Sequence, residues 1–388
     1  MIVKTADRIA KIEEYYFSLK LMEIAKMEAE DIHILNLGIG KPDTAPAASV
    51  INALNEDSLN PKAHGYQPYR GTMAFREAIS SYYKRYFNVD ADPSHEILPL
   101  IGSKEGIMHI SMAFLNPGDE VLVPNPGYPV YSSAAELAGA KAIHYNLTEE
   151  NQFQLSMEDI KSKLTDRTKI IWINSPHMPT GTKMSHETME ALVSLGQAQN
   201  ILIASDSPYN FILNDERRSI LEIEGAKDCC IELNSLSKSH GMSGWRIGMA
   251  ISSEEIINAV LRFKSNMDSG IFRPIQHAAI EAMNIDPRWY EMNNRTYGER
   301  RSVIWNMLDR IGFSYDKDVS GLFVWSKVSE KFKNGDEASD FFLNECRVFA
   351  PPGRVFGSNG EMYVRWSLCG PVELIEEASK SIISVMNY

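Results

Sequence analysis

Short apolar runs alternate with helix-like segments along the middle of this 388-residue chain, and this alternation limits its possible folds more than any other feature. The runs are short and apolar and end in Gly, Pro, Asn, Asp or Ser, as buried strands do. They are ILPLIG (97–102), EVLVPNP (120–126), KIIWINSP (169–176), ILIASD (201–206), CCIELNS (229–235) and RIGMAIS (246–252). Helical patterns follow several of them, at about 104–115, 129–138 and 186–199. The alternation predicts an α/β fold in which helices sandwich a mostly parallel central sheet.

The pattern changes near residue 285. A long charged helical segment (289–312) leads to strand-like GLFVWSKV (321–328), then to a helix, to strand-like MYVRWSLC (362–369) and to a closing helix. This mixture predicts a smaller α+β domain. The first thirty residues also have apolar positions at near-helical spacing. We expect residues 1–45 to form an N-terminal arm and part of the small domain, residues 46–284 the large domain, and residues 285–388 the small C-terminal domain.

Composition and charge exclude several classes of protein. A net charge of −12 and a pI near 5.3 argue against nucleic acid as a main partner, because phosphate binding needs a basic face. The start of the chain carries charges throughout, unlike a secretory signal, and no stretch reaches the roughly 18 apolar residues of a membrane span. The four cysteines lack metal-ligand spacing and are typical of reduced core residues. We therefore expect a cytoplasmic protein without a metal site.

One lysine stands out in the segment SLSKSHGMSGWRIG (235–248). Lys238 lies among small hydroxyl residues and glycines, and Arg246 follows in the same segment. A lysine amine becomes a nucleophile for carbonyl compounds when burial or neighbouring cations lower its pKa. Ser235, Ser237 and Arg246 are suitable donors for a phosphate group. The ordinary alternative is a Gly/Ser loop with a solvated lysine.

Further polar residues follow the predicted strands, where the carboxyl ends of parallel strands would bring them together. Gly102, Ser103 and Lys104 follow ILPLIG and open a helix, whose free backbone N–H groups can bind an anion. Tyr128 follows EVLVPNP, and Asp206 and Tyr209 share the end of ILIASD. Taken singly, each has an ordinary role as a helix cap or a packing residue. Their joint occurrence in this order favours a ligand site.

Six separated motifs, from LGIGKPD (37–43) to YVRWSLC (363–369), occur in the order found in one enzyme family. The chain resembles the class I and II, aspartate-aminotransferase-like enzymes of fold type I, which depend on pyridoxal 5′-phosphate. HGYQPYRG, PLIGSKEG and INSPHMPTG resemble the branch that includes diaminopimelate, aspartate and alanine aminotransferases. The resemblance implies transfer of an amino group between an L-amino acid and a 2-oxo acid by a ping-pong mechanism.

The resemblance also implies roles for single residues toward the cofactor. Lys238 would form a Schiff base with it and move the proton at the substrate Cα, and Asp206 would pair with the pyridinium nitrogen. Tyr209 would donate to the phenolic oxygen, and Tyr128 would stack on the ring. The phosphate group would be surrounded by Gly102, Ser103, Lys104, Ser235, Ser237 and Arg246.

Substrate and partner contacts are implied in the same way. Arg365 would bind the substrate α-carboxylate as a bidentate fork, and Gly40 would offer backbone to the same group. Tyr66 would reach the cofactor phosphate of a neighbouring subunit, and Ser269, with Arg273 as a further candidate, would border that subunit's site. These roles predict a homodimer with composite sites. A side-chain carboxylate on the substrate would need a further cation. Arg70, Lys41 and Arg273 are the candidates, and each is also an ordinary surface residue.

Met178 departs from the family pattern. The family usually has asparagine before Pro179-Thr180-Gly181, and that asparagine donates to the cofactor's phenolic oxygen. Methionine has no donor, so Tyr209 would hold this oxygen with one hydrogen bond fewer. We expect the pKa of the Lys238 Schiff base to be higher than in relatives with asparagine. Pro176 and Pro179 are candidates for cis peptide bonds.

Two other functions fit parts of the sequence. A β-eliminating C–S lyase or a related synthase of the same fold would share most of these residues, but it would release ammonia from an amino acid alone. A regulatory or structural relative without turnover is favoured only by Met178. Retention of Lys238, Asp206 and Arg365 argues against it.

Overall fold

The computed structural model describes residues 3–12 and 14–386 and has a seven-stranded sheet as its largest element. The strand order is β2-β8-β7-β6-β5-β3-β4. All neighbouring pairs are parallel except those of β8, which runs antiparallel to both β2 and β7. The strands are β2 (Ile97–Leu100), β3 (Glu120–Asn125), β4 (Lys141–Asn146), β5 (Thr168–Asn174), β6 (Leu202–Asp206), β7 (Cys230–Ser235) and β8 (Gly248–Ile251). The mostly parallel sheet predicted from the sequence is confirmed.

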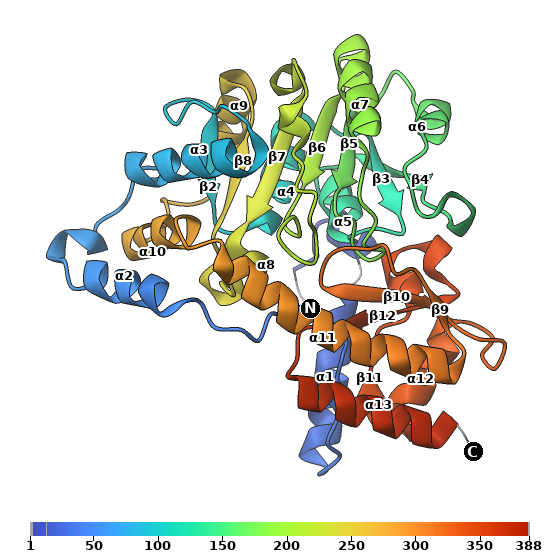
Figure 1. Cartoon of the computed structure of the whole chain (residues 1–388). Coiled ribbons are helices and arrows are strands. Elements are labelled where there is room, and N and C mark those ends of the chain that lie inside the picture. The colour runs from blue at the N-terminus through green and yellow to red at the C-terminus, as the bar shows by residue number, and fades with distance from the viewer. Residues whose placement is uncertain (1–2, 13, 387–388) are drawn as a thin grey trace.

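Helices cover both faces of this sheet (Figure 1). Side chains alternate along a strand, so Ile171 and Ile173 of β5 join one apolar cluster while Ile170 and Trp172 join another. The first cluster includes residues of α3 (Met73–Phe87), α7 (His186–Gln199) and α10 (Arg273–Met283), and the second includes residues of α4 (Ser103–Phe114), α5 (Val130–Leu137) and α9 (Glu254–Lys264). The remaining helices of this part are α2 (Ala48–Ser58), α6 (Met157–Lys163) and α8 (Leu236–Ser239).

A second group of elements, at the lower right of Figure 1, is built around its own apolar cluster. Its sheet has the order β12-β10-β9 and is antiparallel, and β1 pairs with β11 in parallel. Arg300 forms a bidentate ion pair with Asp43, at 2.7 Å to each carboxylate oxygen, which fixes the segment after β1. The elements are α1 (Tyr16–Ala29), β1 (Leu35–Asn36), α11 (Arg288–Ile311), β9 (Ser314–Tyr315), β10 (Phe323–Lys327), α12 (Gly335–Glu345), β11 (Val348–Phe349), β12 (Tyr363–Ser367) and α13 (Val372–Met386).

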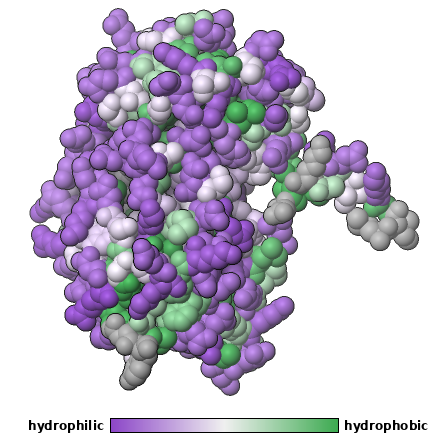
Figure 2. Space-filling view, turned by 90° about the vertical axis from the view of Figure 1, so that its right-hand side faces the viewer, coloured by the Kyte–Doolittle hydropathy of each residue, from purple (hydrophilic) through white to green (hydrophobic). Residues whose placement is uncertain are grey.

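The N-terminal segment differs from the sequence prediction. The near-helical spacing of apolar positions predicts a helix through the first thirty residues, but α1 begins only at Tyr16, after a single 3-10 turn at Ile9–Lys11. Residues 3–10 are exposed, and Figure 2 shows one segment standing away from the rest of the molecule. From Tyr16 onward the segment packs against the rest of the chain, since Ile24 shares an apolar cluster with Leu343 and Phe349. Apolar spacing alone did not reveal where this packing begins.

Other boundaries agree more closely. The helix predicted at 186–199 is α7, and the one at 129–138 is α5. The segments 97–102 and 229–235 contain β2 and β7. The domain boundaries after residues 45 and 284 stay predictions. Across the part of the chain that the structure describes, no helix is both long enough and apolar enough to span a membrane.

Candidate active site

A cavity of about 720 Å³ lies where the carboxyl ends of β5, β6 and β7 meet residues of β10 and β12. This is where an open parallel sheet binds its ligand. Most of the residues singled out from the sequence line it: Gly40, Ser103, Lys104, Tyr128, Met178, Asp206, Tyr209, Ser235, Ser237, Lys238, Arg246 and Arg365. Gly102 lies directly before the first residue of α4. The structure therefore brings together residues from segments that lie far apart in the sequence.

Lys238 projects from α8, the short helix that begins where β7 ends. Ser235 caps this helix by accepting a hydrogen bond from the Ser237 N–H (3.1 Å). The Lys238 ammonium donates to the Gly40 carbonyl. Burial lowers the pKa of Lys238, and the neighbouring cations Arg365 and Arg246 act in the same direction. These are the conditions that turn a lysine into a nucleophile for carbonyl compounds.

Asp206 is the last residue of β6 and is 5% exposed. Its Oδ2 accepts a hydrogen bond from the Tyr131 hydroxyl (2.9 Å), while its Oδ1 has no partner within the described residues. Burial raises the pKa of Asp206 to about 6, although Tyr131 and Lys238 oppose the change. A buried carboxylate oxygen without a donor is suited to a cationic or N–H ligand atom.

Two tyrosines complete the walls around Asp206. Tyr209 packs edge-on against Phe323 with ring centroids 6.1 Å apart, and Tyr128 packs edge-on against Tyr131 at 5.6 Å. Burial raises the pKa of the Tyr128 and Tyr209 hydroxyls above the ordinary tyrosine value. Both hydroxyls therefore keep their protons and can donate hydrogen bonds near neutral pH.

An anion cradle lies at the start of α4. Gly102 has φ +80°, and a Cβ on it would lie 2.0 Å from Nη2 of Arg246. Only glycine lets the guanidinium approach the helix N-terminus, where the first backbone N–H groups lack helical partners. Lys104 extends over the Tyr15 ring, 4.8 Å from its centroid. Ser237 lines the cradle, whereas the Ser235 hydroxyl already donates to the Ile247 carbonyl (3.1 Å).

Arg365 lies on β12 and is buried without a carboxylate beside it in the described residues. Its Nη2 donates to the Gly38 carbonyl (2.6 Å), its Nη1 lies 3.3 Å from Sδ of Met178, and its Nε has no partner within residues 3–12 and 14–386. Burial lowers the pKa of Arg365 to about 10. Gly40 is required nearby, because a Cβ on it would lie 2.4 Å from Phe323. The guanidinium is thus available to bind an anion.

Other predicted residues lie outside this cavity. Tyr66 is 93% exposed, and Ser269 is exposed as well. Arg273 forms a bidentate ion pair with Asp57, at 3.0 and 2.7 Å, and Arg70 is hydrogen-bonded to Asn258. Of the three cations considered for a second carboxylate, Lys41 alone is among the cavity-lining residues that the structure describes.

Several lining residues were not found from the sequence. Tyr131 holds Asp206, and Asn174 at the end of β5 donates to the Asp206 carbonyl (2.5 Å) and accepts from the Met178 N–H (2.7 Å). Asn174 ends a predicted strand, so the rule that selected Asp206 would also have selected it. Tyr15 and Phe17 come from the N-terminal segment, and no motif marks them. The peptide bonds before Pro176 and Pro179 are cis, as expected, and so is the bond between Asn125 and Pro126.

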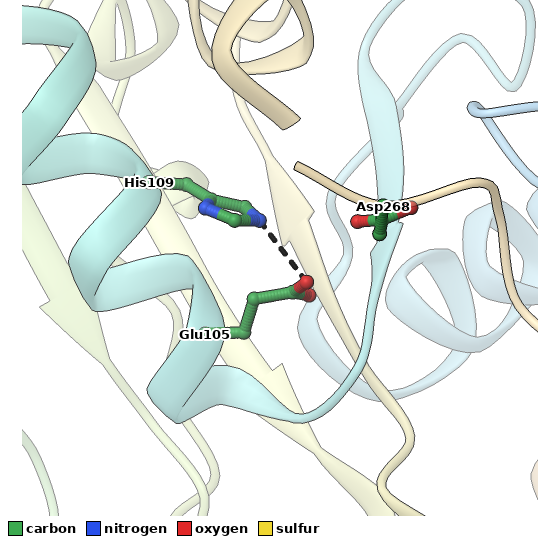
Figure 3. Close-up of side chains that lie close together, drawn as sticks. All are labelled: Glu105, His109 and Asp268. Atoms are coloured by element: carbon green, nitrogen blue, oxygen red, sulfur yellow. Dashed lines mark ion pairs between the residues drawn. The ribbon is translucent and has the colours of Figure 1, made fainter. Parts of the chain in front are cut away.

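A separate cluster of charged side chains lies on the other side of α4. Figure 3 shows Glu105 and His109 one turn apart on this helix, with Asp268 facing them. The His109 Nε2 lies 3.1 Å from Glu105 Oε1. The fully buried Lys264 ammonium pairs with Asp268 and lies 4.0 Å from Glu105. A lysine thus supplies the positive charge in this cluster.

Comparison with known proteins identifies the family. The model of the family described as aminotransferase class I and II matches residues 32–382. This chain belongs to that family. The LL-diaminopimelate aminotransferase of Aquifex aeolicus is 37% identical to this aminotransferase over 380 residues, which are 97% of this chain and 98% of that protein.

Solved structures agree with this assignment. Apo-BacF from Bacillus subtilis superposes on this aminotransferase with a TM-score of 0.95 at 34% identity, covering 99% of this chain and 98% of that one. An aromatic aminotransferase from Pyrococcus horikoshii has a TM-score of 0.89 at 29% identity and covers 98% of both chains. The fold-type I architecture predicted from the sequence is confirmed. The lyase alternative is not favoured, since the curated relatives are named LL-diaminopimelate aminotransferases.

Membership of the family implies pyridoxal phosphate as cofactor, and the cavity has the features that such a group needs. Asp206 Oδ1 is a buried acceptor without a donor in the described chain. The contact between Gly102 and Arg246 leaves a cradle of N–H groups for a phosphate. Lys238 lines the same cavity with a lowered pKa. The residues present therefore fit this cofactor.

Proposed function

We propose that this aminotransferase binds pyridoxal phosphate in the cavity at the strand ends and carries an amino group from an α-amino acid to a 2-oxo acid. One observation supports the proposal most directly. Lys238, Asp206 and Arg365 are ionisable side chains that line one cavity. Asp206 and Arg365 are buried and have polar atoms without a partner in the described chain, and Lys238 is half-buried with a lowered pKa. When bound, pyridoxal phosphate supplies an aldehyde carbon that takes up the amino group and a ring that accepts electrons released at the substrate Cα.

Residues of the large sheet would hold the cofactor. Asp206 would accept from the ring nitrogen and keep it protonated, while Tyr131 holds the carboxylate in place. Tyr209 would donate to the phenolic oxygen, and Tyr128 would lie against the ring. The phosphate would be bound by Gly102, Ser103, Lys104, Ser237 and Arg246, with Ser235 shaping the loop behind them.

Lys238 would hold the cofactor covalently and then act on protons. Its pKa is lowered by burial, so a neutral amine is available at lower pH than in an ordinary lysine. A neutral amine can take the proton from the substrate Cα and return it elsewhere on the reacting system. Its contact with the Gly40 carbonyl fixes where the amine lies in the free enzyme.

Arg365 would bind the α-carboxylate of both donor and acceptor. An arginine buried beside a thioether and a carbonyl gains a carboxylate partner when substrate enters, which makes the α-carboxylate a requirement. LL-diaminopimelate, for which the curated relatives are named, also carries such an α-carboxylate.

We also propose a homodimer with composite sites. Tyr66 and Ser269 are exposed and lie outside this chain's cavity, which suits residues that serve a neighbour's site. Arg273 is a weaker candidate because Asp57 already pairs with it. A cytoplasmic location is supported by the four cysteines, which are all free.

The function is tested with purified holoenzyme and a panel of amino donors. Amino acid together with 2-oxoglutarate or pyruvate should give the new amino acid in equal amount. Amino acid alone should give at most one equivalent of its 2-oxo acid per enzyme and release no ammonia. Lys238→Ala should abolish transfer while cofactor still binds without a covalent bond. Repeated release of ammonia from an amino acid alone would identify a lyase and refute the proposal.

A further inference from the structure

The cavity wall beside the carboxylate-binding arginine is mainly apolar, with Ser18 of α1 as a polar exception. The Arg365 guanidinium carbon lies 4.0 Å from the centroid of the Phe323 ring, 4.5 Å from that of Phe356 and 5.2 Å from that of Phe17. Leu21 and Ile39 line the same cavity. Phe17 and Leu21 both come from α1, so the N-terminal helix contributes much of this wall. A substrate held by its α-carboxylate at Arg365 would therefore extend its side chain along apolar groups.

The cavity offers few charged side chains to a substrate that is charged at both ends. The far end of diaminopimelate carries a second ammonium and a second carboxylate, and both need partners once they leave water. Within the described chain, Asp206 is the sole carboxylate that lines the cavity, and it lies at the end of β6, where Tyr131 already donates to it. Lys41 could pair with a second carboxylate, but this chain has no acidic side chain left in the wall for a second ammonium. The residues proposed to reach this cavity from a neighbouring subunit are not acidic either.

We propose that the preferred amino donor of this enzyme is an α-amino acid with a large, uncharged and mainly apolar side chain, aromatic or branched aliphatic. The inference deepens the proposed function and rests on it. The side chain would pack on Phe17, Leu21, Ile39 and Phe356 and displace water from them, while Arg365 holds the α-carboxylate. A small donor such as alanine would fill the carboxylate site but leave the wall in contact with water.

A donor panel on the holoenzyme tests this substrate class. With saturating 2-oxoglutarate, kcat/KM for L-phenylalanine or L-leucine should exceed that for L-alanine, L-aspartate and LL-diaminopimelate by roughly tenfold or more. A preference for LL-diaminopimelate or L-aspartate would overturn the inference and leave the proposed function intact. Absence of transfer from every donor would overturn the proposed function, and the inference with it.

Equilibrium binding gives a readout that does not depend on turnover. 3-Phenylpropionate, which carries the carboxylate and an apolar end but no amino group, should bind the holoenzyme roughly tenfold or more tightly than propionate. It should also show the negative heat-capacity change of apolar burial. Equal affinities for the two acids would overturn the proposed wall.

Two leucines of α1 provide a matched pair of variants. Leu21 lines the cavity and is 42% exposed, whereas Leu19 is 47% exposed and is not among the lining residues. Leu21→Ala should raise KM for L-phenylalanine roughly threefold to tenfold and leave KM for L-alanine nearly unchanged. Leu19→Ala should change neither. An equal effect of Leu21→Ala on both donors would contradict a side-chain subsite at this position.

Discussion

Burial makes the ionised form of Asp206 unfavourable in the cofactor-free protein, and replacing Asp206 with asparagine measures the free-energy cost of that buried charge. Burial raises its pKa from 3.8 to about 6. The difference corresponds to roughly 3 kcal/mol at 1.36 kcal/mol per pH unit. Asparagine removes the charge and can still accept from Tyr131, but it leaves amide N–H groups unpaired at a cost of about 1 kcal/mol. Asp206→Asn should therefore stabilise the cofactor-free protein by about 2 kcal/mol at pH 8.

The dependence on pH follows from the direction of this shift. Below pH 3.8 the carboxyl group is protonated in both the folded and the unfolded chain, so it carries no penalty. As the pH rises through about 6, the folded chain must ionise a buried group, and the stability that the neutral form provided is lost. The advantage of the variant should thus vanish toward pH 4 and reach its full size above pH 7.

Urea unfolding of the cofactor-free wild type and variant, run in parallel from pH 4.5 to pH 8, checks this. Tyr131→Phe is the matched control, because it takes away the hydrogen bond to Oδ2 and should lower stability at pH 8. Added pyridoxal phosphate should stabilise wild type more than Asp206→Asn, since the carboxylate then gains a positive partner. A variant that is less stable at pH 8, or a difference that does not change with pH, would refute the reasoning.

Three further substitutions test other parts of the structure. Gly102→Ala should weaken pyridoxal phosphate binding at least tenfold in a fluorescence titration, because the added Cβ would lie 2.0 Å from Nη2 of Arg246. Gly118→Ala is the control: Gly118 also has a positive φ, but its Cβ would meet open space, so this change should not weaken cofactor binding. Lys264→Met leaves the partly buried Asp268 and Glu105 carboxylates without their cation and should reduce the free energy of unfolding by about 3 kcal/mol, with partial recovery when Asp268→Asn is added. Met178→Asn adds a hydrogen-bond donor that faces the cavity, so the visible absorbance of the lysine-bound cofactor should titrate at lower pH than in wild type. Equal pH midpoints in the two titrations would contradict the role given to this methionine.

The sequence predicted the core of the site because strand ends can be read from hydrophobic patterning. Once 201–206 and 229–235 are taken as parallel strands, Asp206 and Lys238 must lie at the same edge of the sheet. The direction of β8 was not predicted. It follows β7 after only α8 and the 3-10 turn Ser243–Trp245, and such a short connection cannot return to the start of the sheet, so β8 runs antiparallel.

The residues that the sequence did not reveal act through tertiary packing. Tyr131 reaches Asp206 from the first turns of α5, and its ring stacks on Trp172 of β5 at 4.9 Å between centroids. Nothing in the local sequence distinguishes Tyr131 from the nearby Tyr128, which is the tyrosine predicted to contact the ligand. Phe17 reaches Arg365 only because α1 packs against the second group of elements. Such contacts depend on how distant helices dock, which periodicity does not record.

The balance of charge in the cavity predicts how strictly different parts of a donor are recognised. Arg365 is buried beside Gly38 and Met178, and its Nε has no partner in the described chain. An amino donor without an α-carboxylate therefore leaves this desolvated guanidinium unpaired. Sites built around such polar groups reject analogues that lack the matching group by factors on the order of 10⁴, whereas an apolar wall distinguishes side chains by roughly 10 to 200-fold per methylene. Phenethylamine should therefore be a far poorer donor than any L-amino acid of the panel, alanine included. If phenethylamine and L-alanine reacted with similar kcat/KM, Arg365 would not be the residue that selects the substrate, and the apolar wall would have to be placed elsewhere in the cavity.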